Sequence, residues 1–500
     1  MTGPLGFPLW IVVTHFLNLL LLSLLARSGL EILSAFPKLY RSDHCPPGHE
    51  LVRFSRKVFW PDAPRPWSSL EEEESWSPLL ALPGRRNLGI GRHWHFLTVQ
   101  FWVFTGLVYV ALLCVSGQWV RLVPTSWAVV PAAFHSLSVY LDGRLPPAQP
   151  GLPYNAAQQL AYFAVVFVLA PLQIATGAAM SPAVLARFPW YGRLFAGKQV
   201  ARLLHFAGLC AFGAFVVAHT AMVVVHGIPE GFAHIVLGSA DPGANHPLAL
   251  ALGLGGIGVV ALINAAATIF SLGHRRRSQR LLGAAVEPLE RLLSRLLVSR
   301  QRYGPGEVSP FLRVNGYPPT DPEYRALAED GFAGYRLRVG GLVETPLTFS
   351  LEQLRALGAV EQVTLHSCIQ GWTGVAAWSG VPLARVLAAC GPQREVRHVV
   401  VHAFDDKGVT EPEDGTGHFY ESIPIELAGR PQTILALEMN GRPLPVEHGA
   451  PVRLRVETQL GYKMVKWVRG IELVADLATV GLGQGGWRED HQYYGRTAGI

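Results

Sequence analysis

Two histidines within one long apolar stretch have the type and spacing for metal chemistry. His205 and His219 lie fourteen residues apart in ARLLHFAGLCAFGAFVVAHTAMVVVHG. On a helix that spacing is about 21 Å and returns to nearly the same face. Imidazole is a good iron ligand, and a histidine in hydrocarbon is costly without a partner. The pair therefore fits two haems stacked across a membrane, although buried histidines bonded to neighbouring helices explain it equally well on these residues alone.

Five apolar segments are long enough to cross a bilayer as helices and to position such ligands. They cover residues 9–30, 94–117, 160–181, 203–227 and 247–272. Because successive spans alternate in direction, the start of the first span faces the same side as the end of the fourth. The start of the second span faces the same side as the start of the fourth.

This alternation matches further histidines to the first two. His15, near the start of the first span, shares a depth with His219. His93 and His95, near the start of the second span, share a depth with His205. We therefore predict two bis-histidine sites at opposite membrane depths.

A shared local pattern favours His95 over its neighbour as the partner of His205. Arg92 precedes His95 by three residues, Arg202 precedes His205 by three, and a phenylalanine follows each histidine. An arginine one turn from an axial ligand can pair with haem propionates through charge-assisted hydrogen bonds. Ordinary anchoring of both arginines at the membrane interface is the alternative.

The histidine pattern resembles the di-haem cytochrome b subunits of formate dehydrogenases and nickel-iron hydrogenases, over roughly residues 5–240. The resemblance implies that His15, His95, His205 and His219 ligate two haems b. It also implies electron transfer between a quinone pool and an attached redox enzyme. The position of a quinone site does not follow from the sequence.

Composition and charge divide the chain into two parts. The 500 residues are 50% hydrophobic, with apolar residues concentrated in the first half. Residues 1–304 carry 24 Lys and Arg against 13 Asp and Glu, whereas residues 305–500 carry 18 against 23. These features predict a membrane protein with a soluble domain attached. The resemblance implies a multi-pass protein of a bacterial-type inner membrane. The basic residues border apolar spans, which argues against nucleic-acid binding.

Basic residues also predict an orientation. The first apolar segment has no basic region or cleavage motif, so we expect a retained span instead of a signal peptide. Nearly all Lys and Arg outside the spans lie in the first and third loops and after the fifth span, whereas the opposite side has only Arg121 and Arg144. The positive-inside rule then predicts a cytoplasmic C-terminal domain. The resemblance favours a periplasmic domain instead, because the start of span one is usually cytoplasmic in those subunits.

Residues 276–306 connect the last span to the soluble part. Their leucines and arginines are arranged as on an amphipathic helix interrupted near Pro288. The helix either lies along the membrane surface or packs on the soluble domain as a plain linker. Its apolar face consists of Leu282, Leu289, Leu292, Leu293, Leu296 and Leu297.

The remainder of the chain is rich in short β segments with frequent Gly and Pro. Strands are expected at residues 335–343, 361–368, 397–404, 451–458 and 468–474, with short helices at 350–358 and 382–391. We predict an all-α transmembrane bundle of about five spans followed by a soluble α+β domain. The predicted domains are a bundle at 1–275, a connector at 276–306, a soluble domain at 307–480 and a C-terminal tail at 481–500.

Cys368 ends a predicted strand and precedes a Gly-rich loop in LHSCIQGWTG. A thiolate in such a position suits a soft metal centre. A buried structural cysteine is the default interpretation on this residue alone. The chain's five cysteines form no CxxC pair.

The surrounding residues overturn that default. The segment LALEMNGRPLPVEHGAPVRLRVETQLGYKMVKWVRGIELV resembles the molybdopterin-binding domain of the sulfite oxidase family, over about residues 310–474. The resemblance implies that Cys368 supplies a thiolate to molybdenum. Arginine and lysine suit the pterin phosphate as directional and point-charge partners. The resemblance places cofactor contacts at Arg313, Asn315, His448, Arg453, Met464, Val465 and Lys466.

Departures from the family pattern narrow the activity. Animal and plant sulfite oxidases follow the ligand cysteine with an arginine-bearing segment, whereas Cys368 is followed by Ile-Gln-Gly-Trp. This difference argues against sulfite oxidation. The CxxGW form is similar to bacterial molybdenum methionine-sulfoxide reductases, but those are exported and use a different haem partner, so their substrate does not carry over. No immunoglobulin-like dimerisation domain is expected in the short sequence after Val474.

Together these features predict a membrane-bound molybdenum oxidoreductase. It would exchange electrons between quinone and a molybdenum–molybdopterin cofactor through two haems b, with oxo transfer on a small or sulfoxide-like substrate. The rival prediction is a non-catalytic membrane-anchored binding protein with a degenerate cofactor domain. Retention of Cys368 and its cationic neighbours weighs against that rival. Further pocket candidates, which no spacing argument separates from loop residues, are His366, His402, Asp405, Asp406, His418 and Tyr420.

Overall fold

The computed structural model describes residues 7–57, 67–238, 245–296, 298–496 and 498–499. The chain forms two compact units. The helical unit comprises residues 1–28, 94–176 and 204–272, and the sheet unit comprises residues 29–93, 177–203 and 273–500. The segments between spans one and two and between spans three and four therefore fold with the C-terminal half of the chain.

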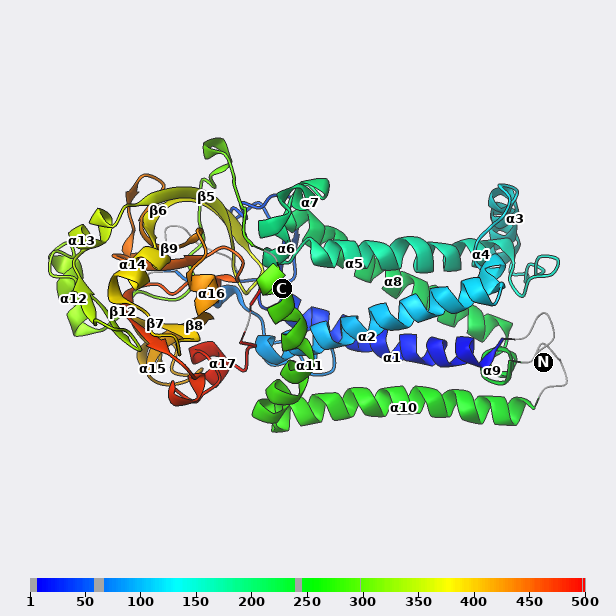
Figure 1. Ribbon diagram of the computed structural model, residues 1–500. Helices are drawn as coiled ribbons and strands as arrows, with labels where there is room; N and C mark the ends of the chain where they lie inside the picture. The colour runs from blue at the N-terminus through cyan, green and yellow to red at the C-terminus, as the bar shows by residue number, and fades with distance from the viewer. Residues whose placement is uncertain (1–6, 58–66, 239–244, 297, 497, 500) are drawn as a thin grey trace. The chain divides into compact units, whose positions relative to one another are not determined.

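Five helices are long and apolar enough to cross a membrane, which confirms the predicted number of spans within the described residues. In lipid, a helix satisfies the hydrogen-bonding groups of its own backbone. A long segment of apolar side chains can therefore cross the membrane as a helix. Figure 1 shows these helices running alongside one another in the helical unit. They are α1 (Leu9–Ser34), α2 (Leu88–Val115), the stretch Ala156–Ala178 that contains α4 and α5, α8 (Lys198–His226) and α10 (His246–Gly273).

The helical unit is held together by a few aromatic and polar contacts. Leu21, Trp102 and Phe212 form a buried cluster between α1, α2 and α8. The indole of Trp102 also donates a hydrogen bond of 3.1 Å to the side-chain oxygen of Asn18. Two shorter apolar helices, α3 (Val129–Leu141) and α9 (Ile228–Leu237), complete the unit. Polar pairs of this kind fix helix register where the hydrophobic effect cannot.

Two five-stranded sheets form the body of the sheet unit. In the first, the order is β10-β9-β6-β5 with β11 also on β9, and in the second it is β4-β3-β12-β7-β8. All pairings are antiparallel except that of β12 with β3. The strands are β3 (Leu337–Gly341), β4 (Leu347–Phe349), β5 (Val360–Ser367), β6 (Thr373–Pro382), β7 (His398–Asp406), β8 (His418–Pro424), β9 (Thr433–Met439), β10 (Arg442–Pro443), β11 (Arg453–Val456) and β12 (Val468–Val474).

All five predicted strands and both predicted helices are confirmed as β3, β5, β7, β11, β12, α13 (Leu351–Ala356) and α14 (Leu383–Cys390). The sequence prediction missed β6 and β9, the central strands of the first sheet. Strand β6 reads TGVAAWSGVP, in which glycine and alanine weaken the apolar signal although most of its residues are buried.

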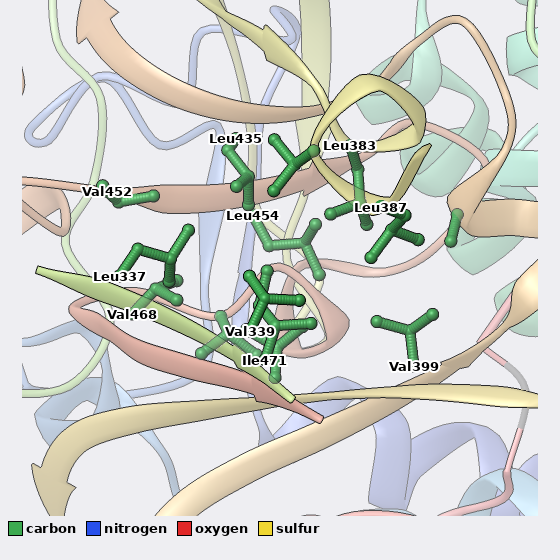
Figure 2. Packing of buried hydrophobic residues seen from close by; sticks show 14 of the residues in the cluster. Leu337, Val339, Leu383, Leu387, Val399, Leu435, Val452, Leu454, Val468 and Ile471 are labelled. Carbon is green, nitrogen blue, oxygen red and sulfur yellow. The ribbon is translucent and has the colours of Figure 1, made fainter. Parts of the chain in front are cut away.

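The core of the sheet unit fills the space between the two sheets. Figure 2 shows aliphatic side chains of both sheets meeting those of α14. Leu337 of β3, Leu454 of β11 and Leu383 of α14 are each fully buried. Burying one such side chain contributes roughly 1.5–3 kcal/mol, so this layer fixes the sheets against each other.

The connector forms one continuous helix, α11 (Arg275–Leu296), so the predicted interruption near Pro288 is wrong. A proline within a helix removes one backbone hydrogen bond. Pro288 lies on the exposed side of α11, and the helix continues past it. The opposite face packs on the sheet unit, where Gln279 donates to the carbonyls of Glu489 and Tyr494 at 2.9 and 2.6 Å. These contacts are those of a linker helix packed on the soluble domain, and both interpretations of the connector stay predictions. Of the predicted apolar face, Leu282 is buried, Leu289, Leu292 and Leu296 are exposed, and Leu297 lies outside the described residues.

Candidate active site and haem-binding histidines

Cys368 lies in a tight loop directly after β5. Its carbonyl accepts a hydrogen bond of 3.1 Å from the amide of Gly371, and its amide donates one of 3.0 Å to the carbonyl of Trp372. Gly371 has a φ of +123°, a backbone conformation that favours glycine. The loop leads directly into β6. Two paired strands therefore fix the position of the buried thiol, which is 3% exposed.

The thiol lines a solvent-open cavity in the sheet unit. Seven of the residues predicted to contact the cofactor line this cavity. They come from three separate parts of the chain, which the two sheets bring together. The seven are Arg313, Asn315, Cys368, His448, Arg453, Met464 and Lys466. Val465, the eighth, is buried in the hydrophobic core instead.

Two cationic side chains, the buried Arg453 and the half-buried Lys466, make the cavity suited to an anion. Arg453, at the start of β11, donates to the carbonyl of His448 at 3.1 Å, but its buried Nε has no hydrogen-bond partner among the described residues. Lys466 donates to the carbonyls of Asn315 and Glu447 at 2.6 and 2.9 Å. Burial lowers the pKa of Arg453 to about 9, with Arg455 adding to the effect. Burial likewise holds the pKa of Lys466 well below its usual value. The lowered pKa values reflect the free-energy cost of keeping each positive charge away from water. A bound phosphate would offset that cost for both residues, so they fit the pterin phosphate.

The two predicted early contacts behave differently from each other. The side-chain amide of Asn315 donates to the sulfur of Cys368 at 3.2 Å and to the side-chain oxygen of Gln370 at 3.0 Å. Arg313 instead directs its guanidinium at Glu72, at 2.5 Å, and at the hydroxyl of Tyr40, at 2.7 Å. Arg313 therefore joins the first inter-span segment to the cavity wall, and its predicted cofactor contact gains no support from this geometry.

Two histidines in the cavity wall are held neutral. Burial, followed by the charges of Arg453 and Lys466, lowers the pKa of His448 to about 3. Burial also holds the pKa of His366 well below its usual value, with Arg453 and Arg455 adding to the effect. Arg455 donates to Nδ1 of His366 at 2.9 Å, so the ring proton of His366 resides on Nε2. A neutral imidazole with its proton on Nε2 is a hydrogen-bond donor to a ligand in the cavity.

Of the six further pocket candidates, only His366 and Asp405 line the cavity. His402 lies 3.1 Å from Glu472, and His418 lies 3.5 Å from Asp321. Tyr420 donates to Asp490, and Asp406 caps the short helix α15 (Lys407–Thr410). These four are ordinary strand and loop residues.

Sequence reasoning missed Lys407, Tyr462 and Arg488, which also line the cavity. Lys407 forms ion pairs with Asp405, at 2.8 Å, and with Glu411. Burial lowers the pKa of Lys407, but these carboxylates outweigh that effect and raise it. Arg488 belongs to α17 (Trp487–His491), inside the segment predicted to be a tail. No local signal near Arg488 indicates that it lines the same cavity as Cys368, a residue more than a hundred positions earlier.

In the helical unit, four histidines form two pairs. The ring centres of His15 and His219 are 6.3 Å apart, and those of His95 and His205 are 6.4 Å apart. Two metal–nitrogen bonds of about 2 Å each, together with the distance from each ring centre to its ligating nitrogen, add up to such a separation. The residues therefore fit an axially ligated haem between the members of each pair, as the alternation of spans predicts.

Hydroxyl groups orient the second pair. The hydroxyl of Ser28 lies 3.1 Å from Nδ1 of His95, and that of Thr176 lies 3.0 Å from Nδ1 of His205. Contacts of this kind leave Nε2 for a metal and fix the ring orientation. His93, the alternative partner, is buried and belongs to the sheet unit.

The predicted haem-propionate arginines also belong to the sheet unit. Arg202 donates to the carbonyls of Phe36 and Lys38, both at 2.6 Å. Arg92 interacts electrostatically with Glu290, Tyr462 and Tyr494. Both arginines therefore have protein partners, and the propionate role gains no support from their contacts.

No group of three or more His, Cys, Asp or Glu side chains that could hold a metal ion occurs among the described residues. Cys368 is thus a single thiolate donor in a cation-lined cavity. A metal there would need most of its ligands from a cofactor, which is the arrangement that a molybdenum–pterin centre provides.

Comparisons with known proteins match both parts of the chain. Residues 6–232 match the family model "Prokaryotic cytochrome b561", and residues 326–479 match "Oxidoreductase molybdopterin binding domain". The "Putative protein-methionine-sulfoxide reductase subunit YedZ1" of Azospira oryzae is 35% identical over 161 residues, covering 32% of this chain and 55% of that protein. The "Protein-methionine-sulfoxide reductase catalytic subunit MsrP" of Xanthomonas axonopodis is 32% identical over 164 residues, covering 31% of this chain and 49% of that protein. The chain thus spans about half the length of these curated relatives.

A solved structure, the sulfane dehydrogenase SoxCD from Paracoccus pantotrophus, is 28% identical with a TM-score of 0.25, covering 29% of this chain and 39% of that chain. The two family models account for the predicted membrane and soluble parts in the predicted order. The chain therefore fuses a cytochrome b561 domain, residues 6–232, to a molybdopterin-binding oxidoreductase domain, residues 326–479.

Proposed function

We propose that this protein reduces a sulfoxide-like group on a small substrate at molybdenum, with electrons that a membrane quinol delivers through two haems b. The observation that carries the proposal is the cavity in which one buried thiol, Cys368, faces Arg453 and Lys466. The membrane domain before the connector, residues 276–306, would then conduct electrons, and the domain after it would be the catalyst.

The residues of the cavity divide into those that hold the cofactor and those that face a substrate. Cys368 would ligate molybdenum, while Arg453, Lys466 and His448 would hold the pterin phosphate. When bound, molybdenum supplies two-electron oxo-transfer chemistry. Burial raises the pKa of the Cys368 thiol, and a bound metal would favour its thiolate form.

A sulfoxide suits the remaining groups in the cavity. Its oxygen is a strong hydrogen-bond acceptor, and His366, Lys407 and Arg488 each present N–H groups in the cavity wall. Reduction of the sulfoxide to a sulfide takes up two electrons and two protons and releases water. The names of the two relatives, both of the methionine-sulfoxide reductase system, support this substrate class.

The histidine pairs support two haems in the membrane part. His15 with His219, and His95 with His205, would each bind one haem b. Each site has the paired imidazoles that low-spin electron-transfer haems use. Quinone is the proposed partner because the family model that matches residues 6–232 describes a cytochrome b561.

We further propose a cytoplasmic position for the molybdenum domain. The first and third inter-span segments fold with the C-terminal half in the sheet unit, as the alternation of spans requires. This side carries nearly all basic residues outside the spans, whereas the other has Arg121 and Arg144. Protease added to spheroplasts should leave the C-terminal domain uncut, and digestion from outside would contradict this orientation.

The function can be tested with the purified full chain in proteoliposomes. Menaquinol or ubiquinol should drive reduction of free methionine sulfoxide. Cys368→Ser should abolish this turnover while leaving the haem spectrum intact. Arg442→Ser, on the exposed strand β10, serves as a control that should retain activity. Unchanged turnover in Cys368→Ser would reject the assignment. Absence of quinol-driven reduction in a molybdenum-loaded wild type would reject the substrate class.

A further inference from the structure

The 3-10 turn Ser69–Glu72, in the first inter-span segment, packs against the loop that carries Cys368. The amide of Ser69 donates to the carbonyl of Val314 at 2.8 Å, and the amide of Gly316 donates to the hydroxyl of Ser68 at 2.8 Å. This turn lies outside the part of the chain that matches the molybdopterin-binding family model, residues 326–479. It nevertheless forms part of the surroundings of the proposed molybdenum ligand.

Gln370, two residues after Cys368, is the centre of these contacts and is 1% exposed. Its side-chain oxygen accepts hydrogen bonds from three N–H and O–H donors: the hydroxyl of Ser69 at 2.6 Å, Asn315 at 3.0 Å and the indole of Trp372 at 3.1 Å. The thiol of Cys368 donates a fourth, longer one of 3.7 Å. Three donors converging on one atom fix which end of the amide is the oxygen.

The other end of the same amide is fixed by acceptors. The side-chain nitrogen of Gln370 donates to a carboxylate oxygen of Glu73 at 2.8 Å and to the carbonyl of Ser69 at 3.1 Å. Burial raises the pKa of Glu73, whereas its ion pair with Arg86 and the hydrogen bond from Gln370 favour the carboxylate. In the ionised form Glu73 accepts and cannot donate, so it holds the NH₂ group of Gln370 toward itself. Glu73 is in turn held by Arg86 at 3.1 Å.

The orientation of the Gln370 amide determines that of the Asn315 amide, which contacts the sulfur of Cys368. Because the oxygen of Gln370 faces Asn315, Asn315 must present its NH₂ group there. The second hydrogen of that group points at the sulfur of Cys368, 3.2 Å away. The chain of contacts therefore ends in an N–H···S hydrogen bond on the residue proposed to ligate molybdenum.

We propose that Ser69 and Glu73 are positioning residues for the molybdenum site, which act through Gln370 and Asn315 to maintain a hydrogen bond on the sulfur of Cys368. This inference rests on the proposed function of Cys368 as the metal ligand. Its consequence is that a loop between two membrane spans sets an electronic property of the metal centre.

The expected effect follows from the chemistry of metal thiolates. A hydrogen bond to a thiolate withdraws electron density from the sulfur, which favours the reduced metal and raises its reduction potential. Loss of the bond should lower that potential and change the environment that the unpaired electron of Mo(V) senses. A segment that merely supports the fold would alter yield or stability and leave both properties unchanged in the loaded protein.

The test uses Ser69→Ala and Glu73→Gln in the full-length, cofactor-loaded protein. The Mo(V) electron paramagnetic resonance spectrum and the Mo(V/IV) midpoint potential are measured by redox titration, because both report only on chains that contain molybdenum. Ser69→Ala removes a donor to Gln370, and Glu73→Gln replaces its charged acceptor with a weaker one. We expect lower midpoint potentials and altered g values, with the larger change in Ser69→Ala.

Glu71→Gln is the matched control, because it removes the same charge from the same turn but Glu71 accepts from Tyr317 instead of Gln370. It should retain the wild-type spectrum and potential. If Ser69→Ala fails to fold, Glu73→Gln, which keeps the size of the side chain, decides the question. Wild-type values in the loaded variants would overturn the inference. A wild type without molybdenum would instead overturn the proposed function.

Discussion

The imidazoles of His95 and His205 face each other in the helical unit with their ring centres 6.4 Å apart. They come from α2 and α8, helices separated in sequence by about a hundred residues. Each ring is oriented at Nδ1 by a hydroxyl, that of Ser28 or that of Thr176. Two histidines oriented in this way are prepared to accept a metal with little rearrangement, which is the physical basis for placing a haem there.

Thr176→Val should weaken haem binding at this pair. The substitution preserves shape and removes the hydroxyl that lies 3.0 Å from Nδ1 of His205. Loss of such an orienting contact lowers metal affinity by roughly 10–100-fold. Haem titration of the detergent-solubilised chain measures the effect. Thr14→Val is the control, because the hydroxyl of Thr14 bonds to carbonyls of its own helix, and equal affinities in both variants would contradict the role of Thr176.

His219→Leu should remove one haem while leaving the molybdenum content unchanged. The ring of His219 is paired with that of His15 in the helical unit, whereas Cys368 lies in the sheet unit. Quinol-driven turnover should stop, but an artificial dye that reduces molybdenum directly should still support it. His226→Leu, on the same helix but outside both pairs, should keep the wild-type haem spectrum. Full haem content in His219→Leu would refute the ligand assignment.

Arg453→Met should abolish retention of the molybdenum cofactor. The substitution removes a buried cation whose Nε lacks a partner among the described residues, and methionine can fill the space beside Trp378. We expect molybdenum per chain to fall by at least about tenfold, since a charge-assisted hydrogen bond of roughly 1.5–3 kcal/mol is lost. Metal analysis after gel filtration measures this. A fully loaded Arg453→Met protein would show that the phosphate is held elsewhere.

The cofactor-free protein should lose stability in acid partly through His448. Its pKa is lowered to about 3 in the folded protein by burial first and then by Arg453 and Lys466, against about 6.5 when unfolded. The unfolded chain therefore binds more protons between these values, so the stabilising contribution is present above about pH 6.5 and is lost as the pH falls toward 3. Between pH 7 and 4, wild type should lose more thermal stability than His448→Gln. Parallel curves would contradict the assigned environment.

Much of this architecture follows from local patterns in the sequence. The alternation of spans was sufficient to pair His15 with His219 and His95 with His205, because helix direction in a membrane permits few alternatives. The clear β-branched runs similarly predicted five strands. Where the apolar pattern was diluted by glycine, as in β6, the prediction failed.

The parts that could not be predicted depend on contacts between distant residues. Nothing near Ser69 or Glu73 indicates that they contact Gln370, about 300 positions later, because each is an ordinary polar residue in a polar loop. Arg202 fits a propionate partner by spacing, yet the carbonyls of Phe36 and Lys38 take its hydrogen bonds. Such pairings are decided by tertiary packing, which overrides local signals.

The central claim is that one chain carries both a molybdenum centre and a two-haem conduit. Metal analysis of the purified full-length protein, combined with a pyridine haemochrome assay, tests it most directly. The account predicts about one molybdenum and two haems b per chain, one haem for each histidine pair. A folded, monodisperse protein that contains neither metal after expression with both cofactors available would contradict it and favour a non-catalytic membrane-anchored binding protein.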